Sequence, residues 1–589
     1  MTEFATARSL QRQSVALFLW SALLTLAIAI YFLGLGGQYT PTNGDELVYI
    51  HIARLTAESG HWLPLVSDLP NMRNTKPPLL FWQALVAGDW GSHWTLWSLR
   101  LPSLLYTFLT TSLVAWAVHG ITRDKRRALL AACVYLAFFS SYRYGRPYLT
   151  SAPETFWLAL PMFVLLGTAF RQDKGAGLSK SPSADSSIAF ALFTGVVWGL
   201  GSAYKSFALI APAAAALWCA RLMVDRDFRF KSLAATSLQI GVSVLIAVGI
   251  FALWFVLDPD PAAVWREFVV GENVGKMSDK AGYWHEAVFG GGSSMWAQLL
   301  AYGENAGLLA FVVIGLAVTA FRNRIAMTSW PPHAHILLAW LGVWVLVFML
   351  PSQRSARYVI PAMPALAIAM VLWWPRIARG WFFASGLLIS VASLVLARIA
   401  WVMQGAQIAS TVEFLLTALA LLAAVGLIGA SFAKATWTRA CVTAACLLVY
   451  GGFGLMVSPL DGQAGRYGSE VQANLTAKSL AVPSNFNAQW ERFEFLLPGN
   501  RLTPFDAALM AAGEPSGRAS LSELLQQHDA VVWGQSEAAQ DQPPCRPACR
   551  VLASRWVVKE RHKSGDITLA NAWSLGWLFS REWIVTSKP

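Results

Sequence analysis

Long apolar runs recur through the first three-quarters of this 589-residue chain and predict a polytopic helical membrane protein. Each run holds about 17 to 25 predominantly apolar residues, the length that a helix needs to cross the hydrocarbon core of a bilayer. The fifth and sixth runs are separated only by Lys205 and its neighbours, so their division is open. We expect thirteen spans, at residues 15–35, 101–118, 128–140, 153–170, 187–203, 206–220, 234–257, 298–321, 335–350, 359–374, 381–401, 411–432 and 440–457.

The pattern changes abruptly near residue 458, where polar residues, Pro and Gly become common and the long apolar runs stop. Short segments at residues 530–533 and 551–558 have the composition of strands, and residues 520–527 have that of a helix. The sequence therefore predicts two parts: a transmembrane domain at 1–457 and a small soluble α/β domain at 458–589.

Two long segments between spans, at about 36–100 and 258–297, are expected to carry function or to pack as interfacial helices. In the first segment, residues 46–58 keep a helical pattern of apolar positions. Residues 77–86 form an apolar stretch that is too short to span a bilayer, which indicates a second interfacial helix.

Composition and charge support the membrane interpretation. Only 13% of the residues are charged and 56% are hydrophobic, which excludes an ordinary soluble protein. The net charge of +12 comes from short basic clusters between apolar runs, so topology explains it and no nucleic-acid partner is expected. With a cytoplasmic N-terminus, these clusters all face the cytoplasm, at residues 123–127, 171–180, 221–231, 322–324, 376–379 and 434–439. An odd number of spans then places the C-terminal domain on the opposite side.

The six cysteines fall into two groups. Four lie within apolar runs and are interpreted as small buried hydrophobes: Cys133, Cys219, Cys441 and Cys446. Cys545 and Cys549 lie in the polar C-terminal part, and one such pair offers too few ligands for a zinc site. We expect a disulfide between them, provided that this part faces an oxidising compartment.

Two adjacent carboxylates, Asp45 and Glu46, open the first interfacial helix, about ten residues after a span. Acidic residues at a helix start interact favourably with the exposed amides and the helix dipole. This structural interpretation accounts for either carboxylate, and a catalytic one stays open beside it.

Motifs along the first loop resemble a known family. They are D-E-x-x-Y-x-x-I-A-R from Asp45, S-G-x-W from Ser59 and K-P-P-L-x-x-W from Lys76. This set resembles the bacterial aminoarabinose transferases of lipid A and the wider protein-O-mannosyltransferase-like branch of the GT-C glycosyltransferases. Farther along, K-S-F-A at Lys205, E-N-V-G-K at 272–276 and S-A-R-Y-V-I-P at 355–361 resemble further family segments in the same order.

The resemblance implies an enzyme of the bacterial inner membrane with a periplasmic C-terminal domain. It would move a sugar from undecaprenyl phosphate or a similar polyprenyl phosphate to lipid A, another glycolipid or a glycan. Asp45 would act as the base in an inverting displacement, with Glu46 as a weaker partner. Glu154 would be a further catalytic carboxylate, although its place at a predicted helix start also fits a capping role.

The remaining candidate residues surround this reaction. Lys76, Lys205, Arg354 and Arg357 are candidate partners of the donor phosphate, since cations stabilise charge on the departing oxygen. Candidates for substrate positioning are Tyr49, Arg54, Glu272, Asn273, His285 and Tyr358. Three simpler interpretations stay open: Lys76 and Arg357 extend to lipid headgroups, Arg54 pairs with Glu58, and the tyrosines only pack.

One departure from the family pattern limits these expectations. The aminoarabinose transferases commonly have a Glu before the lysine that aligns with Lys76, and this Glu has been associated with a metal; here the residue is Thr75. His285 is the other possible ligand, so a divalent metal is possible but we predict none, and the sugar is left open. The alternatives are a protein O-glycosyltransferase and a lipid or glycolipid transporter, which would favour repeated halves and paired polar groups at mid-membrane.

Overall fold

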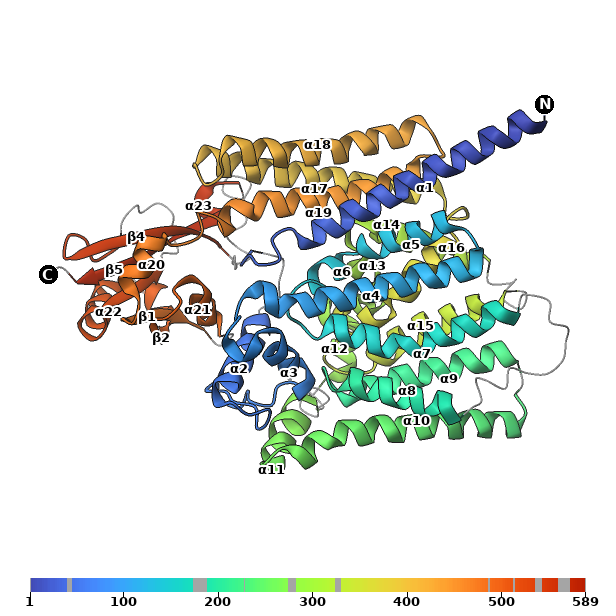
Figure 1. Ribbon diagram of the computed structural model, residues 1–589, viewed down its shortest axis with the longest axis horizontal. Coiled ribbons are helices and arrows are strands. Elements are labelled where there is room, and N and C mark those ends of the chain that lie inside the picture. Colours follow the sequence, from blue (N-terminus) through green and yellow to red (C-terminus); the bar gives the residue numbers. More distant parts are fainter. Residues whose placement is uncertain are drawn as a thin grey trace.

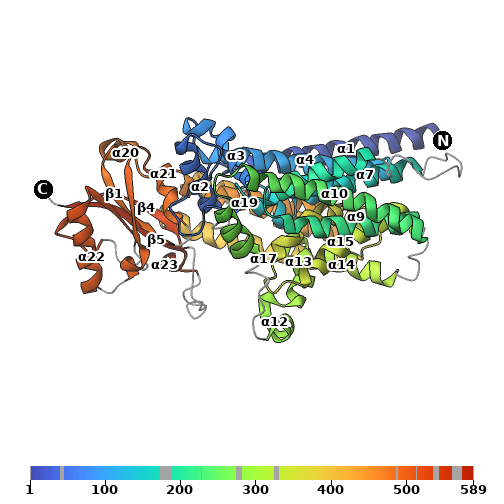
Figure 2. The same cartoon turned by 90° about the horizontal axis from the view of Figure 1, so that it is seen from below.

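The computed structural model describes residues 2–39, 45–172, 188–226, 228–273, 282–323, 330–485, 488–511, 514–534, 543–559 and 573–587. Long helices lie side by side in one bundle, and a small sheet domain covers one end of it (Figure 1). The N-terminus lies at the other end of the bundle, and the C-terminus lies in the sheet domain. The same two parts, the helix bundle and the sheet domain at its end, are seen after a turn of the molecule (Figure 2).

Ten helical segments among the described residues are long and apolar enough to cross a membrane. They are formed by all or part of these helices: α1 (Thr2–Phe32), α4 (Leu96–Thr122), α7 (Ser151–Gln172), α9 (Ile210–Asp225), α10 (Phe230–Leu257), α13 (Met295–Ala306) with α14 (Ala310–Arg322), α15 (Pro332–Met349), α17 (Arg379–Gly405), α18 (Thr411–Ala433) and α19 (Thr438–Asp461). The other three expected spans are shorter helices: α5 (Lys125–Leu136), α8 (Ile188–Ser202) and η8 (Ala356–Ala362) with α16 (Met363–Leu372). The chain is thus a multi-pass integral membrane protein, and the predicted fold class is confirmed.

The burial pattern of the bundle fits a lipid environment. Trp198, Trp340 and Trp344 are wholly enclosed between helices, whereas Leu394 and Leu419 on the outer helices α17 and α18 are about two-thirds exposed. Leucine side chains on an outward face are stable in hydrocarbon and would be costly in water. The turn between α8 and η2 (Phe207–Leu209) separates the fifth and sixth predicted spans, which settles their division.

Both long connecting segments contain short helices. The first forms α2 (Asp45–Ser59), α3 (Pro78–Ala87) and η1 (Asp89–Gly91), so both expected helices are present, and their interfacial position stays a prediction. The second forms α11 (Pro261–Val264), the π-helix η3 (Trp265–Asn273) and α12 (Tyr283–Phe289). Lys276 and part of the basic cluster at 171–180 lie outside the described residues.

The C-terminal domain is built on a five-stranded sheet of order β2-β1-β3-β5-β4. Its strands are β1 (Ser479–Ser484), β2 (Arg501–Asp506), β3 (Ala530–Gly534), β4 (Cys549–Val558) and β5 (Phe579–Ser587). Its helices are α20 (Ser469–Leu475), η9 (Gln489–Glu491), α21 (Arg492–Leu496), α22 (Glu514–Gln527) and α23 (Leu575–Leu578). β1 pairs in parallel with β2 and β3, while β5 is antiparallel to β3 and β4. The strands predicted at residues 530–533 and 551–558 lie within β3 and β4, and the helix predicted at 520–527 lies within α22. Strands β1, β2 and β5 were not predicted.

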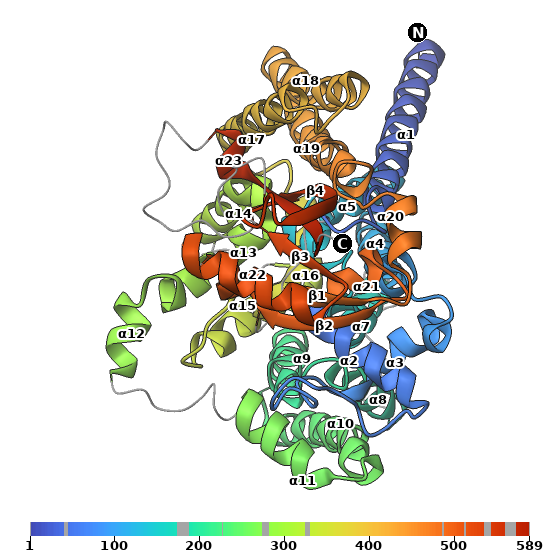
Figure 3. The ribbon, with the colours of Figure 1, turned by 90° about the vertical axis from the view of Figure 1, so that its left-hand side faces the viewer.

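The first loop and the C-terminal domain share one apolar cluster. Ile52 and Leu80 from the loop are buried in the same cluster as Val482, Phe493 and Ile584 from the domain. This shared packing fixes the domain over α2, at the end of the bundle away from the N-terminus (Figures 1 and 3).

Candidate active site

Segments that are far apart in the sequence enclose one polar cavity of about 280 Å³ beside α2. Its walls come from α2, from the loop 60–77 before α3, from the start of α7, from the α8–η2 turn, from η3 and from the start of η8. The lining residues are Asp45, Val48, Tyr49, Met72, Thr75, Lys76, Thr150, Lys205, Glu272, Ser355, Arg357 and Tyr358. Two larger cavities, of about 590 and 1170 Å³, contain none of the predicted site residues. The small cavity is therefore the candidate active site.

Asp45 reaches this cavity from the first turn of α2. Nη1 of Arg357 donates a hydrogen bond to its Oδ2 at 2.9 Å. The Asp45 side chain is 46% exposed, so the carboxylate stays open to the cavity although one oxygen is paired. The guanidinium of Arg357 also lies over the ring of Tyr144, at 5.2 Å, which holds it in place. A carboxylate in this arrangement is accessible and oriented, as proton transfer requires.

Two lysines line the same cavity as Asp45, and each is paired with a different carboxylate. Nζ of Lys76 lies 3.2 Å from Oε2 of Glu272, and Nζ of Lys205 lies 2.9 Å from Oε1 of Glu154. Burial lowers the pKa of the Lys205 ammonium, and the charge of Glu154 only partly opposes this effect. An added anion in the cavity would therefore stabilise the charged form of this lysine.

Two aromatic rings complete the polar wall. Nζ of Lys76 lies 5.7 Å from the centre of the Tyr49 ring, and Nζ of Lys205 lies at the same distance from the Tyr358 ring. Tyr49 is almost fully buried, and burial with the charge of Asp45 raises the pKa of its phenol well above the usual value. The phenol thus stays protonated, so it can donate a hydrogen bond to a substrate but cannot serve as a base.

Glu154 is wholly buried beside the cavity and does not line it. Its Oε1 accepts from Lys205, and its Oε2 has no hydrogen-bond partner among the described residues. The geometry gives Glu154 one clear task, which is to hold the Lys205 ammonium at the cavity wall.

Glu46 points the other way from its neighbour Asp45 and does not line the cavity, so the catalytic role expected for it stays a prediction. Its side chain is buried and receives two hydrogen bonds from Arg100, at 2.7 and 2.9 Å, and one from the backbone N–H of Tyr148. Arg100 also donates to the carbonyls of Leu35 and Gly37. The Glu46–Arg100 pair thus ties α2 to α4 and to the end of α1. Arg100 was not among the predicted site residues. An arginine at the start of an apolar run needs a carboxylate or carbonyl partner, and this signal could have identified it.

Arg354 and His285 also lie away from the cavity. Arg354 is buried, donates to the carbonyls of Met349 and Ser293, and does not line the cavity. His285 lies exposed on α12 against Phe289, and α12 projects from the opposite flank to α2 (Figures 2 and 3). Both residues lie outside the cavity lining, and the roles expected for them stay predictions.

Two residues predicted to position substrate contact protein groups instead. Asn273 accepts a hydrogen bond from the hydroxyl of Ser206, next to Lys205, and so joins η3 to the α8–η2 turn. Arg54 pairs with Glu58, the simpler interpretation that the sequence left open, and also with Glu491 of the C-terminal domain. Both side chains support the walls of the cavity from outside.

The acidic, histidine and cysteine side chains bear on the expected absence of a metal and on the expected disulfide. In the part of the chain that the structure describes, no three His, Cys, Asp or Glu side chains gather as a metal site. Thr75, the residue before Lys76, lines the cavity. In the C-terminal domain, Cys545 and Cys549 are joined by a disulfide at the start of β4.

Comparison with known proteins gives the same picture as the first-loop motifs. Residues 15–260 match the family of dolichyl-phosphate-mannose-protein mannosyltransferases. The undecaprenyl phosphate-α-4-amino-4-deoxy-L-arabinose arabinosyl transferase of Pectobacterium carotovorum is 26% identical over 360 residues, which are 60% of this chain and 58% of that protein. The corresponding transferase of Sodalis glossinidius is 25% identical over 367 residues. The alignments thus span somewhat over half the length of these relatives.

The fold has a match among solved structures. The crystal structure of ArnT from Cupriavidus metallidurans bound to undecaprenyl phosphate superposes with a TM-score of 0.56 at 15% identity, over 96% of this chain and 97% of that one. The apo form of the same protein gives a TM-score of 0.55. The resemblance seen in the first loop is confirmed: this chain is similar in sequence to the aminoarabinose transferases over somewhat more than half of its length, and it has the fold of the ArnT structures.

Proposed function

We propose that this chain is an integral membrane glycosyltransferase that moves a sugar from a polyprenyl phosphate to an extracytoplasmic acceptor. One observation carries the proposal: the cavity places the accessible carboxylate of Asp45 among the cations Lys76, Lys205 and Arg357. The relatives support it, because their names describe transfer of aminoarabinose from undecaprenyl phosphate. The acceptor class that we propose is lipid A or a similar glycolipid.

In the proposed reaction, Asp45 accepts the proton of an acceptor hydroxyl while the hydroxyl oxygen attacks the anomeric carbon. The bond between that carbon and the phosphate oxygen breaks, its electron pair leaves with the polyprenyl phosphate, and the anomeric configuration inverts. The cations Lys76, Lys205 and Arg357 would stabilise the negative charge of the leaving phosphate. Each of them is paired with a carboxylate, so a bound phosphate would replace one anionic partner by another.

The proposed topology places this reaction outside the cytoplasm. We assign the N-terminus to the cytoplasm and residues 458–589 to a periplasmic domain of a bacterial inner-membrane protein. The basic clusters between the predicted spans support this orientation. The cavity and the C-terminal domain lie at the same end of the bundle, so donor and acceptor would meet in the outer leaflet (Figure 1).

A donor panel tests the proposal directly. Purified full-length protein is incubated with radiolabelled polyprenyl-phosphate sugars, including an amino-pentose, and with a lipid A extract or membrane proteins as acceptors. We expect label to appear in the glycolipid fraction with at least one donor. Label attached to Ser or Thr side chains of the membrane proteins would show that the acceptor is a protein and not a glycolipid. No transfer from any donor by folded protein, together with donor movement across vesicles, would overturn the proposal in favour of transport.

Loss of one cavity cation is expected to weaken use of the donor. Replacing Lys76 by Met removes a hydrogen-bonding charge near the proposed phosphate, a contact with a typical value of about 1.5–3 kcal/mol. We therefore expect kcat/KM for the donor to fall about tenfold to a hundredfold. Steady-state transfer measures this change, with Lys231→Met as the control because Lys231 is exposed at the start of α10. Equal losses in both variants would contradict the assignment.

A further inference from the structure

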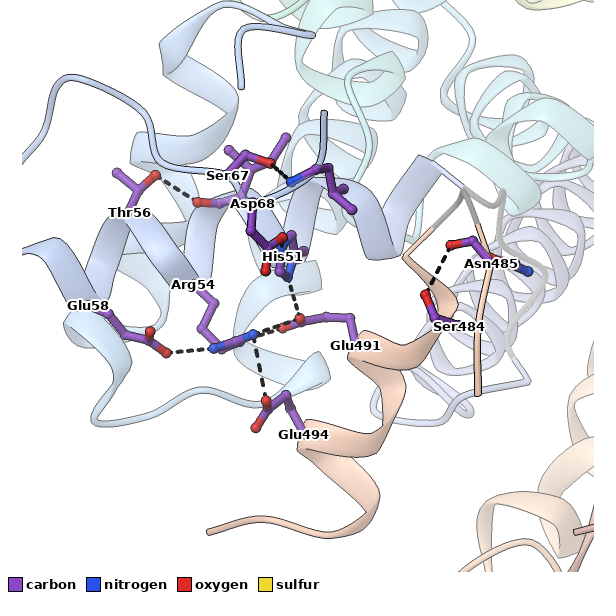
Figure 4. Close-up of polar contacts among 12 residues, drawn as sticks. His51, Arg54, Thr56, Glu58, Ser67, Asp68, Ser484, Asn485, Glu491 and Glu494 are labelled. Carbon is purple, nitrogen blue, oxygen red and sulfur yellow. Dashed lines mark hydrogen bonds and ion pairs between the residues drawn. The ribbon is translucent and has the colours of Figure 1, made fainter. Parts of the chain in front are cut away.

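A cluster of charged side chains joins α2 to the C-terminal domain on the face of α2 away from the cavity. We call it the α2 charge cluster; its members are His51, Arg54, Glu58, Asp68, Glu491 and Glu494 (Figure 4). His51 and Glu491 are completely buried, whereas Asp68 is 62% exposed. The cluster does not contact the cavity, and the proposed reaction does not use it directly.

His51 occupies the centre of this cluster and bridges two carboxylates. Its Nδ1 lies 2.8 Å from Oε2 of Glu491, and its Nε2 lies 2.5 Å from Oδ1 of Asp68. An ionised carboxylate can only accept hydrogen bonds, so each ring nitrogen has to donate one. A neutral imidazole has a single N–H, and only the imidazolium satisfies both contacts. The edge of the ring also packs against Trp490, with ring centres 4.9 Å apart.

The surrounding charges favour the same protonation state. Arg54 donates to both oxygens of Glu491, at 2.7 and 2.9 Å, and lies 3.6 Å from Glu494 on α21 and 2.7 Å from Glu58 on α2. The cluster thus has four carboxyl groups, on Glu58, Asp68, Glu491 and Glu494, for one arginine and one histidine. Burial lowers the pKa of His51, but the hydrogen bonds and charges of Glu491 and Asp68 outweigh it, so the pKa is raised above 6.5.

The bridged segments are also the ones that shape the cavity. Asp68 belongs to the loop 60–77, whose last residues, Thr75 and Lys76, form part of the cavity wall. His51 lies less than two turns after Asp45 on the same helix. The loop has few other polar ties to α2; one is the hydrogen bond from the Val66 N–H to the hydroxyl of Thr56. The His51 bridge therefore holds the loop against α2 and the C-terminal domain together.

We propose that His51, as an imidazolium between Asp68 and Glu491, is a positioning residue that fixes the loop 60–77 and its cavity residues against the C-terminal domain. The stabilisation it provides is complete below the ordinary histidine pKa of about 6.5 and is lost as the pH rises through the raised folded value. The link from this loop to sugar transfer rests on the function proposed above. The structural part of the inference does not depend on it.

Hydrogen–deuterium exchange of the full-length protein in detergent tests the structural part without any substrate. After correction for the intrinsic pH dependence of exchange, protection of the amides in the loop 60–77 is expected to fall about tenfold between about pH 6 and about pH 9 in the wild type. Asp68→Asn removes the exposed partner, so its loss of protection should occur at lower pH. Glu58→Gln is the matched control, because Glu58 is similarly exposed and pairs with Arg54 but not with His51. Its profile should follow the wild type.

Two results would overturn the inference: protection of the loop that does not change with pH, or identical exchange in Asp68→Asn and the wild type. The pH profile of kcat for transfer supplies the second readout. The alkaline decline of kcat should move to lower pH in Asp68→Asn and stay in place in Glu58→Gln, which a purely structural defect would not produce. The expected exchange pattern without any transfer by the wild type would refute the proposed function and support the positioning role of His51.

Discussion

Replacing Asp45 by Asn is expected to lower sugar transfer by about a hundredfold to ten-thousandfold, the usual contribution of a positioned general base. The amide has nearly the same shape as the carboxylate, and its Oδ1 can still accept the hydrogen bond that Arg357 donates to Asp45. It cannot take up the proton of the attacking hydroxyl. The variant should therefore bind the donor and fold normally while the chemical step fails.

The prediction is checked by measuring kcat and KM separately in the purified variant. A loss confined to kcat agrees with a base, whereas a rise in KM alone would show that Asp45 orients the substrate. Asp89→Asn is the control, since Asp89 is an exposed carboxylate of the same loop that lies outside the cavity. Unchanged transfer by Asp45→Asn would remove Asp45 from the chemistry.

Asp45 and Glu46 show how much of the site can be predicted from the sequence. The first-loop motifs located both residues, but successive positions on a helix point about 100° apart. One side chain therefore faces the cavity, and the other turns inward to Arg100. A sequence pattern gives the spacing along a helix and not its rotation against the neighbouring helices. The spacing of a motif also does not show that Arg357 lines the cavity while Arg354, in the non-helical segment before η8, donates to backbone carbonyls.

The residues of the α2 charge cluster show a second limit. His51 and Glu491 are 440 residues apart, and no local pattern connects them. Their contact exists because the C-terminal domain packs on the first loop through a shared apolar cluster. The domain and the loop can each be predicted from local sequence patterns. The packing of one against the other cannot, because no local pattern describes that contact.

Two missed strands have a local cause. β1 and β2 each contain a proline, Pro483 and Pro504, which argues against a strand because proline lacks the backbone donor. The sheet tolerates both. β2 is an edge strand, and β3 pairs with β1 only at Leu480 and Ala481, before Pro483 is reached. The long apolar runs involve no such conflict, so the membrane helices could be predicted from the sequence.

Replacing Arg100 by Met is expected to cost about 3–5 kcal/mol of unfolding free energy, because it leaves the buried carboxylate of Glu46 without its cation. Replacing both partners, as in Arg100→Met with Glu46→Leu, removes the buried charge altogether and should recover most of this loss. The recovery should be incomplete, since the carbonyls of Leu35 and Gly37 also lose their donor. Denaturant unfolding of the purified proteins in detergent measures each value.

The double variant also tests the structural role that the geometry gives to Glu46. If this residue only ties α2 to α4, the folded double variant should keep most of the sugar transfer of the wild type, because Asp45 and Arg357 are unchanged. A double variant with near wild-type stability and a transfer rate as low as that of Asp45→Asn would contradict this assignment. Such a result would mean that Glu46 takes part in the reaction, since the stability measurement would have excluded loss of the fold as the cause.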